Sequence, residues 1–142
     1  MKLVDANVLL YAVNESDAKH DEARTWLDGA LSGTETVGLA WVALLAFLRL
    51  STKVGLFPHP LAVADALACV QAWVDQPATV ILEATPRHLA IVAGLLGDAG
   101  SGANLVNDAH LAALALEHGA TVVSYDRDFG RFAGLAWHLP VP

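Results

Sequence analysis

The chain has few charged residues, and basic residues are the scarcer kind. Only 16% of its 142 residues are charged, with 8 Lys and Arg against 15 Asp and Glu, so the net charge is -7. This balance excludes a broad basic surface of the kind that coats nucleic acid. Any nucleic-acid contact has to be local, and the small groupings of basic residues are Arg49 with Lys53 and Arg127 with Arg131. Both pairs also fit the solvent-exposed face of a helix or loop.

Cysteine is nearly absent, and apolar runs long enough to cross a membrane are missing. The single cysteine, Cys69, has no partner for an internal disulfide, and its apolar surroundings predict a buried thiol in a reducing compartment. Asp5 interrupts the first apolar run too early for a signal peptide. The longest apolar run, GLAWVALLAFL, is too short to span a bilayer. We expect a cytoplasmic protein that makes no membrane contact.

Motifs of several common enzyme classes are also missing. The six histidines show no close metal-ligand spacing such as His-x-His, and His110 lies two positions after Asp108, off its face of the helix. The glycine-rich segment GLLGDAGSGAN lacks the Lys-Ser/Thr of a P-loop and the spacing of a dinucleotide fingerprint. No Gly-x-Ser-x-Gly elbow occurs. These absences disfavour a zinc site, a phosphate cradle and a serine hydrolase.

The apolar pattern switches between the two periods of strands and helices. Short runs rich in β-branched residues predict strands at 3–4, 36–39, 79–82 and 121–124. Helical spacing predicts one helix from Ser16 or Asp17 to Gly33, and others at 41–52, 61–74, 86–96 and 105–118. Strands that alternate with helices indicate an α/β fold with a parallel sheet. With 55% hydrophobic residues, we expect a single domain over residues 1–142.

Acidic residues occur just after two predicted strands and at one helix start. Asp5 follows the first strand, Asp108 lies in the first turn of a helix that Asn104 can cap, and Asp126 with Asp128 follows the last strand. Each has an ordinary explanation: a helix N-cap, a favourable place in the helix dipole, and an Asx turn. Ligands of a parallel sheet bind beyond the carboxyl ends of its strands, so all these groups can face one crevice.

Carboxylates that share a crevice need a counter-charge. Two of them about 5 Å apart repel by roughly 3 kcal/mol at an effective dielectric constant near 20, so a cluster of three protonates or recruits a cation. Oxygen ligands without nearby Cys or paired His select a hard ion such as Mg²⁺ or Mn²⁺. The sequence therefore indicates a Mg²⁺ or Mn²⁺ site.

Three segments carry these acids: LVDANVLLYA at the start, NDAHLAALALEHGA in the last long helix, and TVVSYDRDF after it. In these three segments taken together, the chain resembles a PIN-domain ribonuclease, and most closely the VapC toxins of bacterial type II toxin–antitoxin pairs. The resemblance covers essentially the whole chain. It implies a three-layer α/β/α fold with a central parallel sheet. It also implies a metal-dependent endoribonuclease that hydrolyses RNA phosphodiester bonds and leaves a 5′-phosphate and a 3′-hydroxyl.

The resemblance assigns roles to particular residues. By the family pattern, Asp5, Asp108 and Asp126 would hold the Mg²⁺ or Mn²⁺ ion, and Asp128 would act beside them by orienting the attacking water. Two amides, Asn7 and Asn107, would support these carboxylates, and each also fits a local cap.

One helix departs from the family pattern. Members commonly have a Glu in the helix that corresponds to WVALLAFLRLST, and here the matching position is Ala46, with no acid elsewhere in that helix. We treat the absence as a trait of a subfamily. It bears on how many ions bind, and it makes one strongly held ion the expected case.

The resemblance also implies partners. They are an RNA substrate (tRNA, rRNA or mRNA), a cognate antitoxin that inserts a segment beside the acidic pocket, and a second copy of the chain in a homodimer. The ion, with Arg49, Lys53, Arg127 or Arg131, would hold the RNA. The apolar helix at 41–50 fits either a partner contact or the core.

Two other hypotheses stay open. The first is a non-catalytic PIN-fold module that binds RNA or a partner without cutting, because one acid is missing. The second is a phosphatase of another α/β family. A haloacid-dehalogenase-like enzyme would have a second Asp two residues after the strand-end Asp, where this chain has Asn7.

Overall fold

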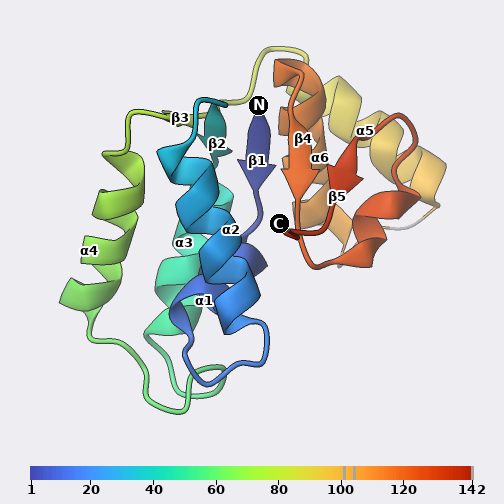
Figure 1. The fold of residues 1–142 in the computed structure, drawn as a ribbon. Helices are drawn as coiled ribbons and strands as arrows, with labels where there is room; N and C mark the ends of the chain where they lie inside the picture. Colours follow the sequence, from blue (N-terminus) through green and yellow to red (C-terminus); the bar gives the residue numbers. More distant parts are fainter. Residues whose placement is uncertain (101, 104, 142) are drawn as a thin grey trace.

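The computed structural model describes residues 1–100, 102–103 and 105–141, and within them it shows a parallel sheet with helices on both faces (Figure 1). The strands are β1 (Lys2–Val4), β2 (Val37–Leu39), β3 (Thr79–Ile81), β4 (Thr121–Val123) and β5 (Trp137–His138). The helices are α1 (Ala6–Val13), α2 (His20–Ser32), α3 (Trp41–Ser51), α4 (Val63–Val74), α5 (His88–Ala99) and α6 (Leu105–His118), with a 3₁₀ helix η1 (Arg127–Arg131) after β4.

The strand order explains how the helices divide between the two faces. The order is β3-β2-β1-β4-β5, and all neighbours are parallel. The chain moves outward from β1 to β2 and β3, and then returns to the other side of β1 for β4 and β5. Because crossovers between parallel strands are right-handed, this reversal places the later helices on the opposite face. Helices α1 to α4 cover one face and α5 with α6 the other, which confirms the predicted three-layer α/β/α fold (Figure 1).

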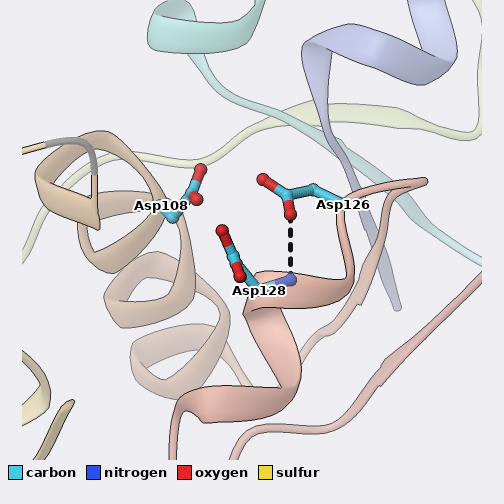
Figure 2. A group of neighbouring side chains, drawn as sticks. All are labelled: Asp108, Asp126 and Asp128. Atoms are coloured by element: carbon cyan, nitrogen blue, oxygen red, sulfur yellow. Dashed lines mark hydrogen bonds between the residues drawn. The ribbon is translucent and has the colours of Figure 1, made fainter.

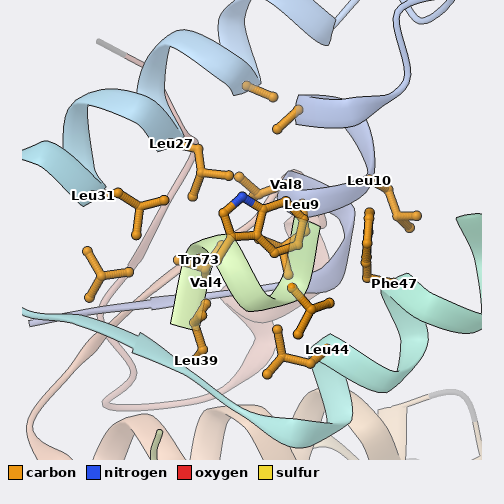
Figure 3. Close-up of a cluster of buried hydrophobic side chains, with 14 of the residues drawn as sticks. Val4, Val8, Leu9, Leu10, Leu27, Leu31, Leu39, Leu44, Phe47 and Trp73 are labelled. Carbon is orange, nitrogen blue, oxygen red and sulfur yellow. The ribbon is translucent and has the colours of Figure 1, made fainter. Parts of the chain in front are cut away.

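The larger core lies between the sheet and helices α1 to α4. Alternate strand residues such as Val4 and Leu39 point into it, because successive side chains of a strand face opposite sides. The ring of Phe47 meets that of Trp73 edge to face, with centroids 4.8 Å apart (Figure 3). Since Phe47 lies on α3, this packing fixes the helix that forms one wall of the site described below.

The second core lies between the sheet and helices α5 and α6. Strand residues Leu3 and Val122 point into it, and α6 contributes several buried alanines that allow close packing on the sheet. Gly38 of β2 also allows close packing, in this case of the Leu82 side chain, because a Cβ at position 38 would lie 2.8 Å from Cδ1 of Leu82. Close packing of α6 sets the depth at which its first turn, with Asp108, meets the sheet edge.

Most predicted elements are confirmed, with different starts for several helices. Helix α6 has the predicted bounds, and Gly119 with its φ of 66° follows it in the left-handed conformation. Helix α2 begins at His20 instead of near Ser16 or Asp17, because Oδ1 of Asp17 accepts a hydrogen bond from the Lys19 amide and closes a separate turn. The expected cap Asn104 lies outside the described residues.

Other boundaries were wrong by two or three residues. Helix α4 begins at Val63 instead of residue 61, after the extended Ala62. Helix α5 begins at His88 and continues past residue 96 to Gly100, whose φ of 67° ends it. Of helix α1 we expected only a start capped by Asp5, and the elements η1 and β5 were missed. None of the helices in the described residues is long and apolar enough to cross a membrane.

Candidate active site

The site lies between β1 and β4, where the order in which the chain adds strands to the sheet reverses. These two strands are neighbours, with Val4 opposite Val123. The amide of Asp5 donates to the carbonyl oxygen of Val123 at 3.0 Å, so the two strand ends are tied together. Asp5 follows β1, and Asp126 follows β4 after a two-residue connection. The reversal point of a parallel sheet is where such folds bind ligands.

Asp5 is both a helix cap and a member of this site. Its Oδ1 accepts a hydrogen bond from the Ala6 amide at 2.7 Å, which caps α1. Its Oδ2 accepts from the Ser124 hydroxyl at 2.6 Å and from the Asn7 side-chain amide at 3.1 Å. Burial raises the pKa of Asp5, and the charge of Asp126 raises it further, against the hydrogen bonds from Ser124 and Ala6. Asp5 therefore caps α1 and also lies among the acids of the candidate site.

Ser124 joins the polar groups of the two strand ends. Its side chain has no exposed surface, and its hydroxyl oxygen accepts from the Asp126 amide at 2.9 Å and from the Asn7 side chain at 3.0 Å. The Oδ1 atom of Asn7 accepts in turn from the Tyr125 amide at 3.1 Å. Asn7 thus supports Asp5 as expected. Ser124 was missed as a site residue, and its only signal was a small polar residue between an apolar strand and an acidic turn.

The carboxylates of Asp108, Asp126 and Asp128 approach one another from two elements. Asp108 extends from the first turn of α6 toward the turn that carries the other two (Figure 2). One oxygen from each of the three lies within 4.8 Å of the others. The Asx-turn explanation also holds, because Oδ1 of Asp126 accepts from the Asp128 amide at 2.9 Å and caps η1. Asp5 lies outside this closest group of three.

Electrostatic coupling links Asp5 to the group. The pKa of Asp108 is raised from 3.8 to about 7, mainly by burial and further by the charges of Asp126, Asp5 and Asp128 and a hydrogen bond with Asp126. A carboxyl group with such a pKa carries only part of its charge at neutral pH. The structure therefore brings all four predicted acids together, at the density of negative charge at which a cation is favourable.

A pocket of about 300 Å³ opens between two of these acids and helix α3. Its lining includes Asp5, Asp108 and Asn107 on one side and Ala46 and Arg49 on the other. The α3 wall therefore has no carboxylate. In the part of the chain that the structure describes, no acidic group lies within 4.0 Å of the exposed Arg49 guanidinium, and no hydrogen bond joins Asn107 to the acids. Asn107 thus lines the pocket without the supporting contact that we expected.

The other basic residues named as RNA contacts lie outside this pocket. Arg131 follows the acidic turn, with Nη1 4.0 Å from Oδ1 of Asp128. Arg127 is exposed on η1, and Lys53 is exposed in the loop after α3. Arg49 is thus the one of these four cations that lines the same pocket as two of the acids, from the facing wall.

Comparisons with known proteins show what this chain is similar to. A family model described as PIN domain matches residues 2–135. Ribonuclease VapC37 of Mycobacterium tuberculosis is 59% identical over 140 residues, which cover 99% of this chain and 97% of that protein.

Two solved structures share the fold. VapC20 of Mycobacterium tuberculosis, a Sarcin-Ricin loop cleaving toxin, is 18% identical with a TM-score of 0.72, and the match covers 96% of this chain and 97% of that one. A chain of a toxin–antitoxin complex from Klebsiella pneumoniae is 13% identical with a TM-score of 0.64, with 99% and 98% covered. At these identities the likeness is one of fold.

Proposed function

Since the chain belongs to the PIN-domain family, and within it to the VapC ribonucleases, we propose that it is the endoribonuclease toxin of a toxin–antitoxin pair. The observation that carries the proposal is that Asp5, Asp108, Asp126 and Asp128 gather at the carboxyl ends of β1 and β4, where the strand order reverses. A single domain over residues 1–142 stays part of this proposal.

Mg²⁺ or Mn²⁺ is the proposed cofactor. The proposed ligands are all carboxylate oxygens, which suit a hard cation. Burial, and to a lesser degree repulsion between the acids, raises the pKa of Asp5 and of Asp108, and a bound cation would stabilise their charged forms. We assign Asp5, Asp108 and Asp126 as ligands, with Asp128 as a fourth carboxylate close to the last two. When bound, the ion supplies positive charge to the scissile phosphate and lowers the pKa of a water molecule.

The chain's own residues hold and orient the reactants. Asp128 is the exposed member of the acidic set, and this exposure supports a role in which its carboxylate accepts a hydrogen bond from the attacking water. Ser124 and Asn7 fix Asp5 through two hydrogen bonds to Oδ2. Arg49, on the facing wall of the pocket, binds a phosphate oxygen, because its planar guanidinium donates to phosphate and has no acidic partner nearby within the described residues.

The proposed partners are RNA, an antitoxin and a second copy of the chain. The name of the 59% identical relative supports RNA as the substrate. A toxin–antitoxin complex among the structures of this fold supports an antitoxin as the protein partner. The homodimer and the cytoplasmic location remain proposals. For the location, the support is the lone Cys69, which is partly buried and whose thiol pKa is raised by that burial.

The alternative is a PIN-fold module that binds RNA without cutting it. The observation in its favour is Ala46, which leaves the α3 wall of the pocket without a carboxylate. The two functions differ in one respect that an assay measures directly, which is whether metal ions make the protein cleave RNA.

The test is cleavage of total bacterial RNA by antitoxin-free protein in Mg²⁺ or Mn²⁺, with mapping of the 5′ ends. Discrete cuts that need metal and disappear in an Asp5→Asn, Asp108→Asn double variant support the ribonuclease. A matched control is Asp28→Asn, because Asp28 is an exposed α2 carboxylate away from the pocket. RNA binding without cleavage by folded, metal-loaded protein would support the alternative.

A further inference from the structure

A second pocket, of about 210 Å³, lies beside the acidic one. The two pockets share Val42 of α3. Helix α6 lines both, with Asp108 facing the first and His110 facing the second. The two side chains lie on different faces of the helix, because residues two apart do not face each other, but the pockets adjoin at Val42. An RNA strand whose phosphate lies at Asp108 can therefore place a neighbouring nucleotide at the second pocket.

Trp41 forms an aromatic wall of this second pocket. It is the first residue of α3, 49% of its surface is exposed, and it belongs to neither hydrophobic cluster of the described residues. The fold therefore does not use the indole for its core. Apolar residues such as Leu82 and Leu114 line the pocket beside it. A flat aromatic ring beside an apolar lining favours a flat, largely uncharged ligand.

A chain of hydrogen bonds fixes the orientation of His110. Its Nδ1 lies 2.7 Å from Nε2 of His88, and Nδ1 of His88 lies 2.6 Å from Oε2 of Glu117. Glu117, whose side chain is 1% exposed, accepts two further hydrogen bonds from Thr85 through Oε1. The remaining ring nitrogen of His110, Nε2, has no hydrogen-bond partner in the described residues. His110 thus brings to the pocket lining a ring held in one orientation, and its Nε2 is available to bond a ligand.

The charge of the pocket excludes a phosphate group as its occupant. The lining has an acidic residue, Glu83, and no Lys or Arg. A carboxylate repels phosphate, but it accepts hydrogen bonds from the amino and imino groups of a base. The volume is also below the range of roughly 300–1,000 Å³ typical of pockets for drug-sized ligands, so it suits one base.

We propose that this pocket binds one unpaired nucleobase of the RNA, next to the scissile phosphate. The base stacks on Trp41 and bonds to Nε2 of His110. Proteins read single-stranded RNA in this way, by stacking splayed bases on aromatic side chains and bonding their edges. The inference rests on the proposed ribonuclease function, and it makes the second pocket the place where the identity of one nucleotide is read.

The test combines a protein change with a substrate change. A short RNA that contains a mapped cut is prepared in its natural form and with an abasic site at each nucleotide near the cut. The proteins are wild type, Trp41→Ala, Trp41→Phe, His110→Phe, and Leu89→Ala as a control on an exposed α5 residue outside both pockets. Thermal unfolding and Mn²⁺ binding check that each variant folds and keeps the acidic site.

We expect Trp41→Ala to lower kcat/KM about tenfold, the size of effect that loss of one base-stacking contact has, and Trp41→Phe to recover most of it. For wild type, an abasic site at one position should lower kcat/KM by a similar factor. For Trp41→Ala, the same abasic RNA should lower kcat/KM little further, because the stacking contact is already lost. His110→Phe should relax the nucleotide preference at that position. If Trp41→Ala and the abasic change lowered kcat/KM by independent factors that multiply at every position, the base subsite would be excluded. The ribonuclease function would still stand.

Binding separates this outcome from failure of the proposed function. If wild type cuts no RNA, fluorescence anisotropy with a short single-stranded RNA that it binds, in natural form and with an abasic site at each position in turn, still tests the pocket. Weaker binding of the one abasic RNA by wild type, lost in Trp41→Ala, would support the subsite in a protein that does not cleave. Equal binding of all RNAs by both proteins would overturn it.

Discussion

The Ser124 hydroxyl lies 2.6 Å from Oδ2 of Asp5, and this hydrogen bond joins the ends of β1 and β4. The two residues are 119 positions apart in the chain. The same hydroxyl oxygen accepts from the Asp126 amide. One buried side chain thus sets the distance between two acids that come from opposite ends of the sequence.

Ser124→Ala should therefore weaken both stability and activity. It leaves Oδ2 of Asp5 with one donor fewer and the Asp126 amide without its acceptor, at a cost of about 1–3 kcal/mol in the free energy of unfolding. RNA cleavage should fall by about tenfold or more, because Asp5 loses its fixed orientation. Urea unfolding and initial cleavage rates measure the two effects.

The chain offers a matched control for this change. Ser51 is also fully buried, and its hydroxyl has no hydrogen-bond partner in the described residues. Ser51→Ala removes the same atom without breaking a hydrogen bond, so stability should stay equal or rise, and cleavage should not change. Equal losses in Ser51→Ala and Ser124→Ala would contradict a role for the Ser124 hydrogen bonds.

The stability of the metal-free protein should depend on the ionisation of Asp108. Its pKa in the folded state, about 7, lies above 3.8, so the folded state binds more protons than the unfolded state between these pH values. The contribution of Asp108 to the free energy of unfolding is then highest below about pH 4 and falls as the pH rises toward 7. Asp108→Asn should be more stable than wild type at about pH 8, on the order of 1 kcal/mol after allowance for solvent screening, and equal to it near pH 4.

Metal should reverse this order. In chelator the Tm of Asp108→Asn exceeds that of wild type near neutral pH, whereas Mn²⁺ raises the Tm of wild type and has little effect on the variant. Thermal scans with and without Mn²⁺ at several pH values measure both effects. A Tm difference that does not change with pH would show that Asp108 is not the group responsible.

The sequence predicted the fold and the acidic residues because both depend on local pattern. Helix α6 was placed correctly, since its apolar spacing is regular and Gly119 ends it. Helix α1 was not recognised beyond its capped start, because ANVLLYAV is nearly all apolar and a short apolar run has the same pattern in a buried strand and a buried helix. The two-residue strand β5 has no pattern of its own and depends on pairing with β4.

Contacts between distant segments could not be predicted in the same way. Asp5, Asp108 and Asp126 were found because each follows a strand end or begins a helix. Ser124 and the network of Glu117, His88 and His110 were missed. His88 and Glu117 are 29 residues apart on different helices, and only the packing of α5 against α6 brings them together.

Arg49 should contribute to substrate binding through its charge and its shape. Removing a hydrogen bond to a charged group costs about 1.5–3 kcal/mol, so Arg49→Ala should lower kcat/KM for RNA at least tenfold without changing Mn²⁺ binding. Arg49→Lys should recover part of the loss, because it keeps the charge but not the paired donors. Arg24→Ala, on α2 and outside the pocket, is the control of equal charge change. A variant of Arg49 as active as Arg24→Ala would exclude a phosphate contact.

Ala46→Glu should strengthen metal binding. Ala46 is partly exposed and faces Asp5 and Asp108 across the pocket, so a carboxylate there adds an oxygen donor to the wall that has none. We expect Mn²⁺ affinity by calorimetry to rise about tenfold or more, or a second ion to bind. The new Glu also lies three positions before Arg49 on the same helix and can pair with it, so RNA affinity should fall even as metal affinity rises. Ala46→Gln adds nearly the same volume without charge, and equal Mn²⁺ affinity in the Glu and Gln variants would place the ion beyond reach of α3.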